Sequence, residues 1–275
     1  MSETFKYFNE SKYYSTKHKK YFDVYDELFS QYKNKKITFV EIGILNGGSL
    51  NIWKKFFGEN ARIIGIDYNP ECKKLESEGY EIFIGNQADE NFWDTFFEKV
   101  GDVDIVLDDG GHTNHQQIST TIKCIPYIKD QGKMVIEDIH TSYQSRFGNP
   151  SKYSFINFCK KLIDDVNSIT NPNYNNFKFS LNKYIYSINF YESFCVFNIN
   201  RSKCVKNTML IKNGKKIFNS DDYRYNDSSF LNFLKTNFSF LLKIKLFKII
   251  IKYQLLLLKY LLNKKNIIKY KKYFK

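Results

Sequence analysis

Five short apolar runs, each followed by glycine or polar residues, constrain this sequence more than any other feature. They are Ile37–Gly43, Arg62–Asp67, Tyr80–Gly85, Val103–Asp108 and Gly132–Glu137. Most of the segments between them are long enough for a helix, and the second connection is the shortest. Because strands that alternate with helices form parallel sheets with both faces covered, the pattern predicts an α/β fold built on a parallel sheet.

The pattern changes after the fifth run. Tyr184–Tyr191 and Phe194–Ile199 are separated only by Glu192 and Ser193, a spacing that predicts an antiparallel hairpin. Five parallel strands closed by a hairpin are the arrangement of class I methyltransferases. We therefore expect a Rossmann-like, mostly parallel sheet of seven strands.

Three parts are expected along the chain. Residues 1–36 form an N-terminal helical cap, with a helix over Tyr21–Gln31 where apolar residues recur at helical spacing. Residues 37–200 form the methyltransferase domain. Residues 201–275 form a polar loop followed by a basic, amphipathic helical tail.

The net charge of +13 is concentrated at one end of the chain. Residues 238–275 hold 11 of the 42 basic residues and no Asp or Glu, which leaves 31 basic against 29 acidic residues elsewhere. A nucleic-acid enzyme more often carries basic residues around its active cleft, so we expect no nucleic-acid partner. Five cysteines without a CxxC pair, and a polar N-terminus without an apolar signal segment, predict a cytoplasmic protein.

The ligand-binding groups of an open α/β sheet gather at the carboxyl ends of its strands. The first strand ends in a loop that contains Gly43, Gly47 and Gly48, and glycines let the backbone approach a ligand closely. This loop matches neither the phosphate-loop nor the dinucleotide glycine pattern. Asp67 ends the second strand, where its carboxylate would accept the ribose hydroxyls of a nucleoside. The alternative is an exposed Asp at a strand end.

The third strand is followed by the segment Gly85–Asp89, which reads GNQAD. Amide and carboxylate groups at this strand end suit the polar edge of adenine. For Asp89 a second role is equally plausible, because Asp is a preferred N-cap residue of helices.

The fourth and fifth strands end in acidic pairs. Asp108 and Asp109 close the fourth, Glu137 and Asp138 close the fifth, and His112 follows Asp109 across two glycines. Four carboxylates at one sheet edge repel one another, and a hard divalent cation such as Mg²⁺ relieves that repulsion. The neutral imidazole of His112 would take a proton from an acceptor hydroxyl that the cation orients. The alternative is a surface histidine or one satisfied within the core. His115 and His140 lack this context and are expected to be structural or peripheral.

These segments resemble the metal-dependent sugar O-methyltransferases of the mycinamicin and macrocin type. Such enzymes act in macrolide biosynthesis, and relatives occur in capsule and surface-polysaccharide gene clusters. The resemblance rests on Phe39–Leu50, Asp108–His112 and Glu137–Tyr143, and it extends over residues 14–200. The DDGxH segment together with the later ED pair is more specific than the glycine loop.

The resemblance implies S-adenosylmethionine (SAM) as methyl donor and Mg²⁺ or another divalent metal as a second cofactor. It implies that Asp109, Glu137 and Asp138 ligate the metal, and that His112 is the general base beside Asp109. It further implies a set of cofactor-binding residues, with the last two near adenine: Glu41, Gly43, Gly47, Asp67, Asp108, Gln87 and Asp89.

The N-terminal segment Ser15–His18 and the helix after it resemble the family's cap over the cofactor. Thr16-Lys17 stands where the family often has an Asp–Lys pair. We therefore expect methylation of a sugar or sugar-nucleotide hydroxyl, in capsule or other surface-glycan synthesis. Two alternatives stay open: another small acceptor, such as a phosphate-derived capsule modification, or a non-catalytic protein of the same fold attached to a membrane.

The tail predicts a surface helix rather than a membrane span. Lys245, Lys248, Lys252 and Lys259 fall on one helical stripe, and no lysine-free stretch approaches the ~20 apolar residues that a span needs. A lysine stripe beside a broad apolar face suits an anionic membrane surface, which would place the protein at the inner face of the membrane. The alternative is a helix that packs within a homo-oligomer or back onto the protein.

Overall fold

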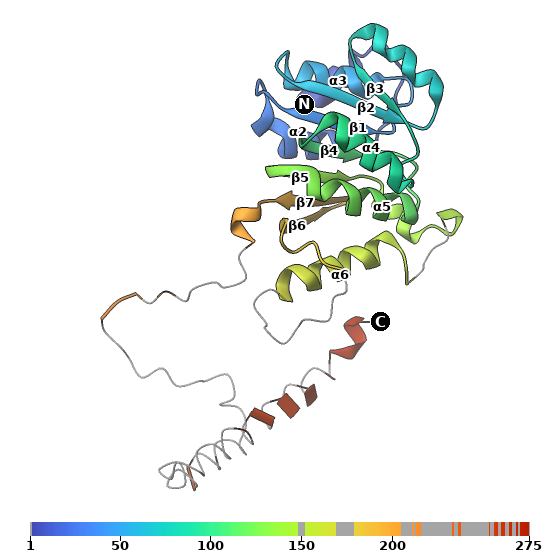
Figure 1. Ribbon diagram of the computed structural model, residues 1–275. Coiled ribbons are helices and arrows are strands. Elements are labelled where there is room, and N and C mark those ends of the chain that lie inside the picture. Colours follow the sequence, from blue (N-terminus) through green and yellow to red (C-terminus); the bar gives the residue numbers. More distant parts are fainter. Residues whose placement is uncertain are drawn as a thin grey trace. The chain divides into compact units, whose positions relative to one another are not determined.

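The computed structural model describes residues 2–147, 152–168 and 179–204 without interruption. Beyond them it describes residues 211 and 213–215 and scattered positions between 233 and 274. The chain forms two compact units, Met1–Met209 and Leu210–Lys275. The first unit carries the sheet and the candidate site (Figure 1).

The sheet of the first unit has seven strands in the order β3-β2-β1-β4-β5-β7-β6. Strands β1 to β5 pair in parallel, and β7 pairs antiparallel with both β5 and β6. The predicted mostly parallel sheet closed by a hairpin is therefore confirmed. The strand bounds are β1 Thr38–Ile42, β2 Arg62–Asp67, β3 Glu81–Ile84, β4 Val103–Asp108, β5 Ile128–Ile136, β6 Ile185–Tyr191 and β7 Phe194–Ile199.

The start of one strand and one connection between strands differ from the sequence-based expectation. Strand β5 begins at Ile128, four residues before the expected Gly132, because Ile128 is buried and pairs with Val103 of β4. The exposed residues Lys129 to Gln131 interrupt the apolar run between Ile128 and Gly132. The short second connection is a 3₁₀ helix, η2 (Pro70–Glu78), rather than an α-helix. Both differences concern residues whose side chains are mostly exposed and leave no apolar pattern in the sequence.

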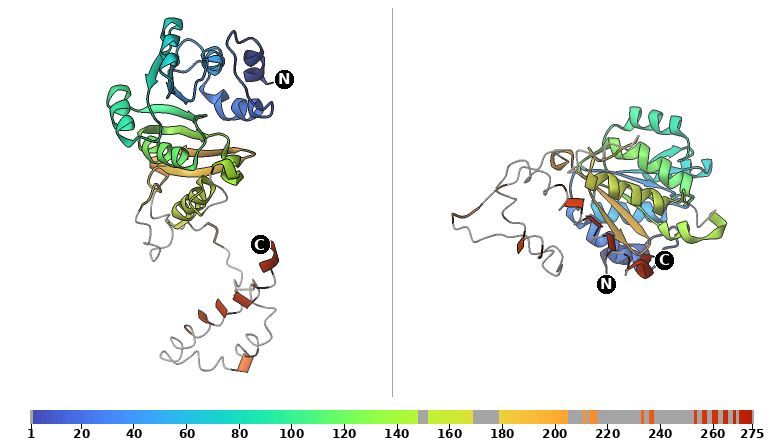
Figure 2. Two further views of the ribbon diagram at one scale, coloured as in Figure 1. Left: turned by 90° about the vertical axis from the view of Figure 1, so that its right-hand side faces the viewer. Right: turned by 90° about the horizontal axis from the view of Figure 1, so that it is seen from below.

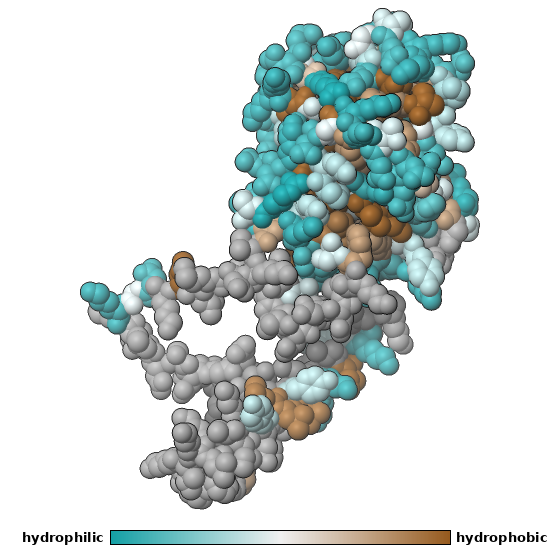
Figure 3. Space-filling view, in the orientation of Figure 1, coloured by the Kyte–Doolittle hydropathy of each residue, from teal (hydrophilic) through white to brown (hydrophobic). Residues whose placement is uncertain are grey.

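Helices cover both faces of the sheet, as Figure 2 shows from two further directions. One layer holds α1 (Glu3–Asn9), α2 (Tyr21–Phe29) and α3 (Gly48–Phe57), which pack on one buried cluster. The other layer holds α4 (Glu90–Val100), α5 (Asn114–Cys124) and α6 (Phe155–Ser168), which pack on a second cluster. Short 3₁₀ helices complete the unit: η1 Ser30–Tyr32, η3 Ile125–Tyr127, η4 Ile139–Tyr143, η5 Ser145–Phe147 and η6 Arg201–Lys203. The face of this unit seen in Figure 3 is mostly hydrophilic.

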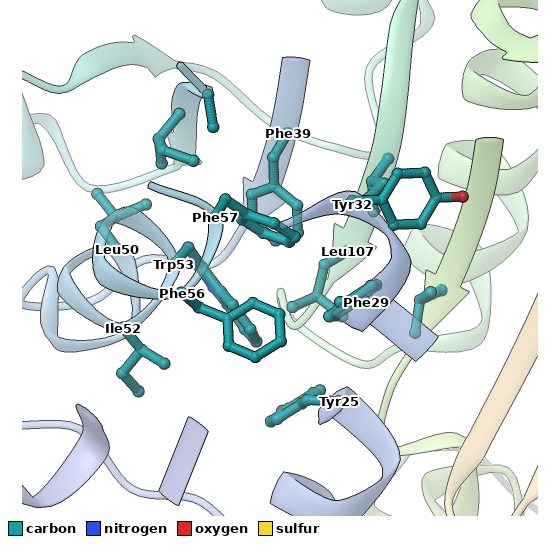
Figure 4. Close-up of a cluster of buried hydrophobic side chains, with 14 of the residues drawn as sticks. Tyr25, Phe29, Tyr32, Phe39, Leu50, Ile52, Trp53, Phe56, Phe57 and Leu107 are labelled. Carbon is teal, nitrogen blue, oxygen red and sulfur yellow. The ribbon is translucent and has the colours of Figure 1, made fainter. Parts of the chain in front are cut away.

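Alternation along the strands feeds both apolar layers. Adjacent residues Phe39 and Val40 of β1 are fully buried, and they belong to the clusters on opposite faces of the sheet. On the first face, Trp53 of α3 lies edge-on to Tyr25 and Phe29 of α2, with ring centroids 5.0 Å and 5.6 Å apart (Figure 4). Aromatic packing thus fixes the N-terminal helix against the sheet, close to the carboxyl ends of the central strands.

Few residues of the second unit are described. They include the short helix η9 (Lys271–Phe274). No helix within the described residues is long and apolar enough to cross a bilayer. The lysine stripe expected at Lys245, Lys248, Lys252 and Lys259 lies outside the described residues.

The tips of β1 and β4 approach each other at Gly43. Gly43 has a φ of +86°, and a β-carbon placed on it would lie 2.2 Å from the carbonyl oxygen of Asp109. Only glycine fits this position, for reasons of both backbone conformation and space. The close approach brings the first and fourth strand ends, predicted from separate motifs, into one site.

We expect Gly43→Ala to lower the free energy of unfolding by about 3 kcal/mol, through left-handed backbone strain plus overpacking. Gly79→Ala is the matched control, because Gly79 also has a φ of +86° but a β-carbon at that position would have no atom within 4 Å. The control should lose only the backbone part, about 1 kcal/mol. Urea unfolding of both variants measures the difference, and equal losses would show that the close approach to Asp109 is unimportant.

Candidate active site

One cavity of 690 Å³ opens at the carboxyl ends of β1 to β4. This volume lies within the range of small-molecule and cofactor sites. Its lining includes Asp67 and Tyr68 from the tip of β2 and Asp109 and His112 from the loop after β4, and β1 lies between these two strands in the sheet. The nucleoside-type and acidic motifs of the sequence therefore share one space. The remaining lining residues are Ile42, Gly43, Leu45, Ile66, Gly85, Asn86, Gln87, Gly110, Gly111 and Gln116.

Asp67 both lines the cavity and shapes the glycine loop. Its Oδ2 accepts hydrogen bonds from the backbone N–H groups of Ile44 and Leu45, both at 3.0 Å, and its Oδ1 accepts one from Asn69 at 2.8 Å. A carboxylate offers about four acceptor positions, so part of its capacity stays available to a ligand. Asp67 thus has a structural role, because it holds the backbone of the loop after β1. Ribose binding by Asp67 stays a prediction.

Gln87 joins the ends of β3 and β4. Its Nε2 donates to Asp108 Oδ1 at 2.9 Å and its Oε1 accepts from the backbone N–H of Gly111 at 2.9 Å. Asp108 is buried behind the cavity lining, and burial raises the pKa of its carboxyl group while the hydrogen bond from Gln87 opposes that rise. The amide expected near adenine thus also fixes the loop that carries His112.

Besides Asp108, three more of the expected cofactor residues lie outside the lining of this cavity. Asp89 caps α4, where its side chain accepts from the backbone N–H of Asn91, so the structure agrees with its alternative role. Gly47 is the left-handed N-cap of α3, and a β-carbon there would meet Leu75. Glu41 is fully buried on the face that α2 and α3 cover, and its Oε2 accepts from Ser49 Oγ at 2.7 Å. A direct contact of these residues with a cofactor stays a prediction.

The two acidic strand ends meet at Lys17, which precedes α2. Its Nζ donates to Asp109 Oδ2 and, at 2.7 Å, to Glu137 Oε1. The Lys17 side chain is only 4% exposed. The other oxygen of Glu137 accepts from the hydroxyl of Tyr25 at 2.5 Å. Asp109 and Glu137 therefore converge, as the sequence predicted, and an ammonium group lies between them.

The charges of this cluster are strongly coupled in the protein without a metal. Burial would lower the pKa of Lys17, but the carboxylates of Asp109 and Glu137 outweigh it and hold that pKa well above its usual value. Burial raises the pKa of Asp109 to about 6, an effect that Lys17 limits. Burial and repulsion from Asp109 raise the pKa of Glu137 to about 8. A single buried cation thus compensates two carboxylates only in part.

A second group of three side chains faces outward from this cluster. Ligand atoms of Asp109, His112 and Asp138 lie within 4.8 Å of one another. His112 Nε2 is 3.8 Å from Asp109 Oδ1 and 3.5 Å from Asp138 Oδ2. This spacing fits one hard cation bound by carboxylate oxygens, with the imidazole beside it. Glu137, which the resemblance implies as a ligand, is held instead by Lys17 and Tyr25, and its place as a ligand stays a prediction.

His112 and Asp138 both have left-handed backbone conformations, with φ of 56° and 55°. Such conformations are uncommon for residues other than glycine and concentrate at functional sites. The turn at His112 is held by Thr141, whose hydroxyl donates to the His112 carbonyl at 2.9 Å. His115 is exposed on α5, outside the group. His140 lies next to Asp138, a member of the group: its Nδ1 is 3.7 Å from Asp138 Oδ1 and 3.1 Å from Ser193 Oγ.

Comparison with known proteins finds similarity to O-methyltransferases. Mycinamicin VI 2''-O-methyltransferase of Micromonospora griseorubida is 32% identical over 154 residues, which are 52% of this chain and 38% of that protein. Demethylmacrocin O-methyltransferase of Streptomyces fradiae is 31% identical over the same shares. This chain thus spans less than half the length of the curated relatives it matches. No protein-family model matches the chain.

Among solved structures, the chain is also similar to a methyltransferase. The MycE methyltransferase of the mycinamycin biosynthetic pathway, in complex with Mg, SAH and mycinamycin VI, superposes with a TM-score of 0.63 and 26% identity. That match covers 72% of this chain and 53% of the other. The fold is that of a Rossmann-like methyltransferase.

Several residues of the site carry no local signal in the sequence. Tyr21, Tyr25 and Lys17 lie in the N-terminal segment, far from the strand ends that they contact. Tyr68 and Leu45 are apolar side chains at the cavity, 76% and 60% exposed. Their one available signal is position, since each follows a strand that ends in a polar motif.

The buried carboxyl group of Glu41 makes the stability of the fold depend on pH. Burial raises the pKa of Glu41 to about 7, from an ordinary 4.5, while Lys17 opposes the rise. The folded protein therefore keeps a proton that the unfolded chain releases, and stability falls as the pH rises from 4.5 to 7. The total loss is about 3 kcal/mol, from 1.36 kcal/mol per pKa unit.

We expect Glu41→Gln to lose this part of the pH dependence, so that it gains stability relative to the wild type at pH 8 but not at pH 4.5. Denaturant unfolding at the two pH values in EDTA measures it. Glu98→Gln, an exposed change on α4, is the control. Parallel curves for wild type and Glu41→Gln would contradict the prediction.

Proposed function

We propose that this chain is a SAM-dependent O-methyltransferase that methylates a sugar hydroxyl with the help of Mg²⁺ or another divalent metal. The observation that carries this proposal is one cavity lined both by Asp67 at the tip of β2 and by Asp109 and His112 after β4, on the two sides of β1. A nucleoside bound at the β2 tip would therefore direct its sulfonium group toward the acidic cluster. The similarity to curated sugar O-methyltransferases supports the same reaction.

The residues at the cavity fit the SAM cofactor. The loop after β1 is held by Asp67, and Gly43, Gly110 and Gly111 line the cavity with backbone that a ligand can approach closely. Tyr68 and Leu45 offer exposed apolar surface for a base. Asn86 and Gln87 supply polar groups after β3.

Carboxylate oxygens of Asp109 and Asp138 fit a divalent metal, with the imidazole of His112 beside it. When bound, a metal ion at this position lowers the pKa of an acceptor hydroxyl and orients it. His112 lies where it would accept the proton of that hydroxyl through Nε2. The loop Asp108–His112 holds the imidazole in place through Gln87 and Thr141. Because SAM carries its own leaving group, the protein mainly has to align the two reactants.

The acceptor is proposed to be a sugar or sugar nucleotide used in capsule or other surface-glycan synthesis in the cytoplasm. The matched relatives, which act on sugars attached to macrolide or polyketide products, support the sugar acceptor. The capsule or surface-glycan role rests on the family resemblance of the sequence motifs alone. Calorimetric titration of SAM, with and without Mg²⁺, tests cofactor binding. Methyl transfer to a panel of nucleotide-linked sugars then tests the acceptor class, with phosphate-bearing acceptors as the alternative. Binding of SAM without transfer to any of them would support a non-catalytic role.

We expect His112→Asn to reduce methyl transfer by at least about 100-fold, the usual contribution of a general base, with SAM affinity within about twofold of the wild type. Asn is chosen because it tolerates the left-handed backbone at this position. The measurement is transfer of radiolabelled methyl under saturating SAM and Mg²⁺. His115→Asn is the matched control and should keep full activity. Retained transfer in His112→Asn would remove this histidine from the reaction.

The basic tail is proposed to contact an anionic membrane surface. Its lysine stripe is a sequence pattern, and the described positions Tyr253, Leu257, Tyr260 and Leu261 are helical and at least half exposed. Tyr253, Leu257 and Tyr260 follow one another at spacings of four and three, and Leu261 lies four residues after Leu257, as on one face of a helix. Lysines beside an exposed apolar face suit anionic headgroups.

We expect the full chain to sediment with vesicles of phosphatidylglycerol but not with vesicles of phosphatidylcholine. Replacing Lys245, Lys248, Lys252 and Lys259 by Gln should weaken that binding at least tenfold, because each lysine contributes about 1 kcal/mol near a charged surface. Light scattering without vesicles tests the rival role in self-association. A chain that binds neither kind of vesicle but forms a concentration-dependent oligomer would overturn the membrane proposal.

A further inference from the structure

We propose that Lys17, Tyr21 and Tyr25 act together as positioning residues for the metal site. Each of these side chains holds an oxygen of a carboxylate at the β4 and β5 tips, and so decides which oxygens stay available to a cation. This inference rests on the metal-binding part of the proposed function. It extends that function by making the N-terminal segment part of the metal site.

The three donors are spaced four residues apart along the chain. Tyr21 and Tyr25 therefore lie one turn apart on the same face of α2, and Lys17 approaches from the segment just before the helix. Their targets are consecutive or facing residues of the strand ends: Asp138, Glu137 and Asp109. One short segment thus contacts all three acidic side chains of the predicted metal site.

Counting oxygens shows what this contact achieves. The Tyr21 hydroxyl donates to Asp138 Oδ1, and Lys17 Nζ donates to Asp109 Oδ2. Both oxygens of Glu137 are engaged, by Lys17 and by Tyr25. The two oxygens that accept none of these bonds from the N-terminal segment are Asp109 Oδ1 and Asp138 Oδ2. These two are the ones that face His112 Nε2, at 3.8 Å and 3.5 Å.

Packing makes the two tyrosine hydroxyls rigid donors. Both rings are buried and lie edge-on to Phe194 of β7, with centroids 4.5 Å and 5.7 Å away. Strand β7 pairs directly with β5, which carries Glu137 and Asp138 at its end. The donors and their acceptors are therefore fixed to the same part of the sheet. Outer hydrogen bonds of this kind orient metal ligands, and losing one typically costs 10- to 100-fold in metal affinity.

Tyr21→Phe tests the proposal because it removes one hydroxyl and keeps the ring on Phe194. Asp138 is then free to rotate, and we expect the affinity for Mn²⁺ to fall about tenfold. The measurement uses the full chain and follows free Mn²⁺ by electron paramagnetic resonance. Calorimetric titration of SAM accompanies it, and SAM affinity should stay within about twofold because Tyr21 does not line the cavity.

Tyr191→Phe is the matched control. Its hydroxyl also joins α2 to the sheet, through a hydrogen bond to Glu27 at 2.5 Å, but it is not bonded to the acidic cluster. It should bind Mn²⁺ like the wild type. Equal losses in the two variants would mean that a looser α2, rather than the lost bond to Asp138, weakens the site, and would overturn the proposal.

The remaining outcomes separate this inference from the proposed function. Wild-type protein that binds Mn²⁺, with Tyr21→Phe binding equally well, overturns the positioning role and leaves the metal site standing. Wild-type protein that binds no Mn²⁺ overturns both the metal site and its positioning residues. Because Tyr21→Phe keeps the buried ring, a melting temperature close to that of the control identifies a folded variant.

Discussion

The buried ammonium of Lys17 is the contact on which the rest of the site depends. It lies between Asp109 and Glu137, which end two neighbouring strands and would otherwise place two uncompensated charges in a buried position. Removing one partner of such a buried network is strongly destabilising, because the remaining charge keeps its desolvation cost. The N-terminal segment therefore contributes charge to the sheet edge as well as a cover of apolar side chains.

Much of the fold follows from the sequence because its signals are local. Strands β2 and β4 begin and end where the apolar runs do, since each is a buried strand bounded by polar residues. The hairpin follows from the two residues between β6 and β7. The convergence of Asp109 and Glu137 also follows, because parallel strands place their carboxyl ends at one edge. What the alternation of strands and helices cannot supply is the strand order, because that order depends on which strands pair in space, and only the structure gives it.

The parts that were not predicted depend on contacts between distant segments. The resemblance placed Lys17 in a cap over the cofactor but did not indicate its contact with the acidic strand ends. Lys17 is 92 residues from Asp109 and 120 from Glu137, and no spacing rule links them. Gln87 was expected to face a ligand and does line the cavity, but no motif indicated that its amide also binds Asp108 and Gly111. Asp89 illustrates the limit differently, because an Asp before a helix is consistent with a cap and with a ligand contact, and only the tertiary structure places it outside the cavity.

The site combines carboxylates that are fixed by hydrogen bonds with residues in strained backbone conformations. Hydrogen bonds from buried groups hold the inner oxygens of Asp109, Glu137 and Asp138. His112 and Asp138, by contrast, sit at left-handed turns that cost free energy and are kept there by Thr141, Gln87 and Tyr21. A backbone strained in this way presents an imidazole nitrogen and two carboxylate oxygens toward one point. Both turns follow strands of the sheet, but the N-terminal segment decides which carboxylate oxygens of Asp109 and Asp138 face that point. The N-terminal cap and the strand tips therefore form one site.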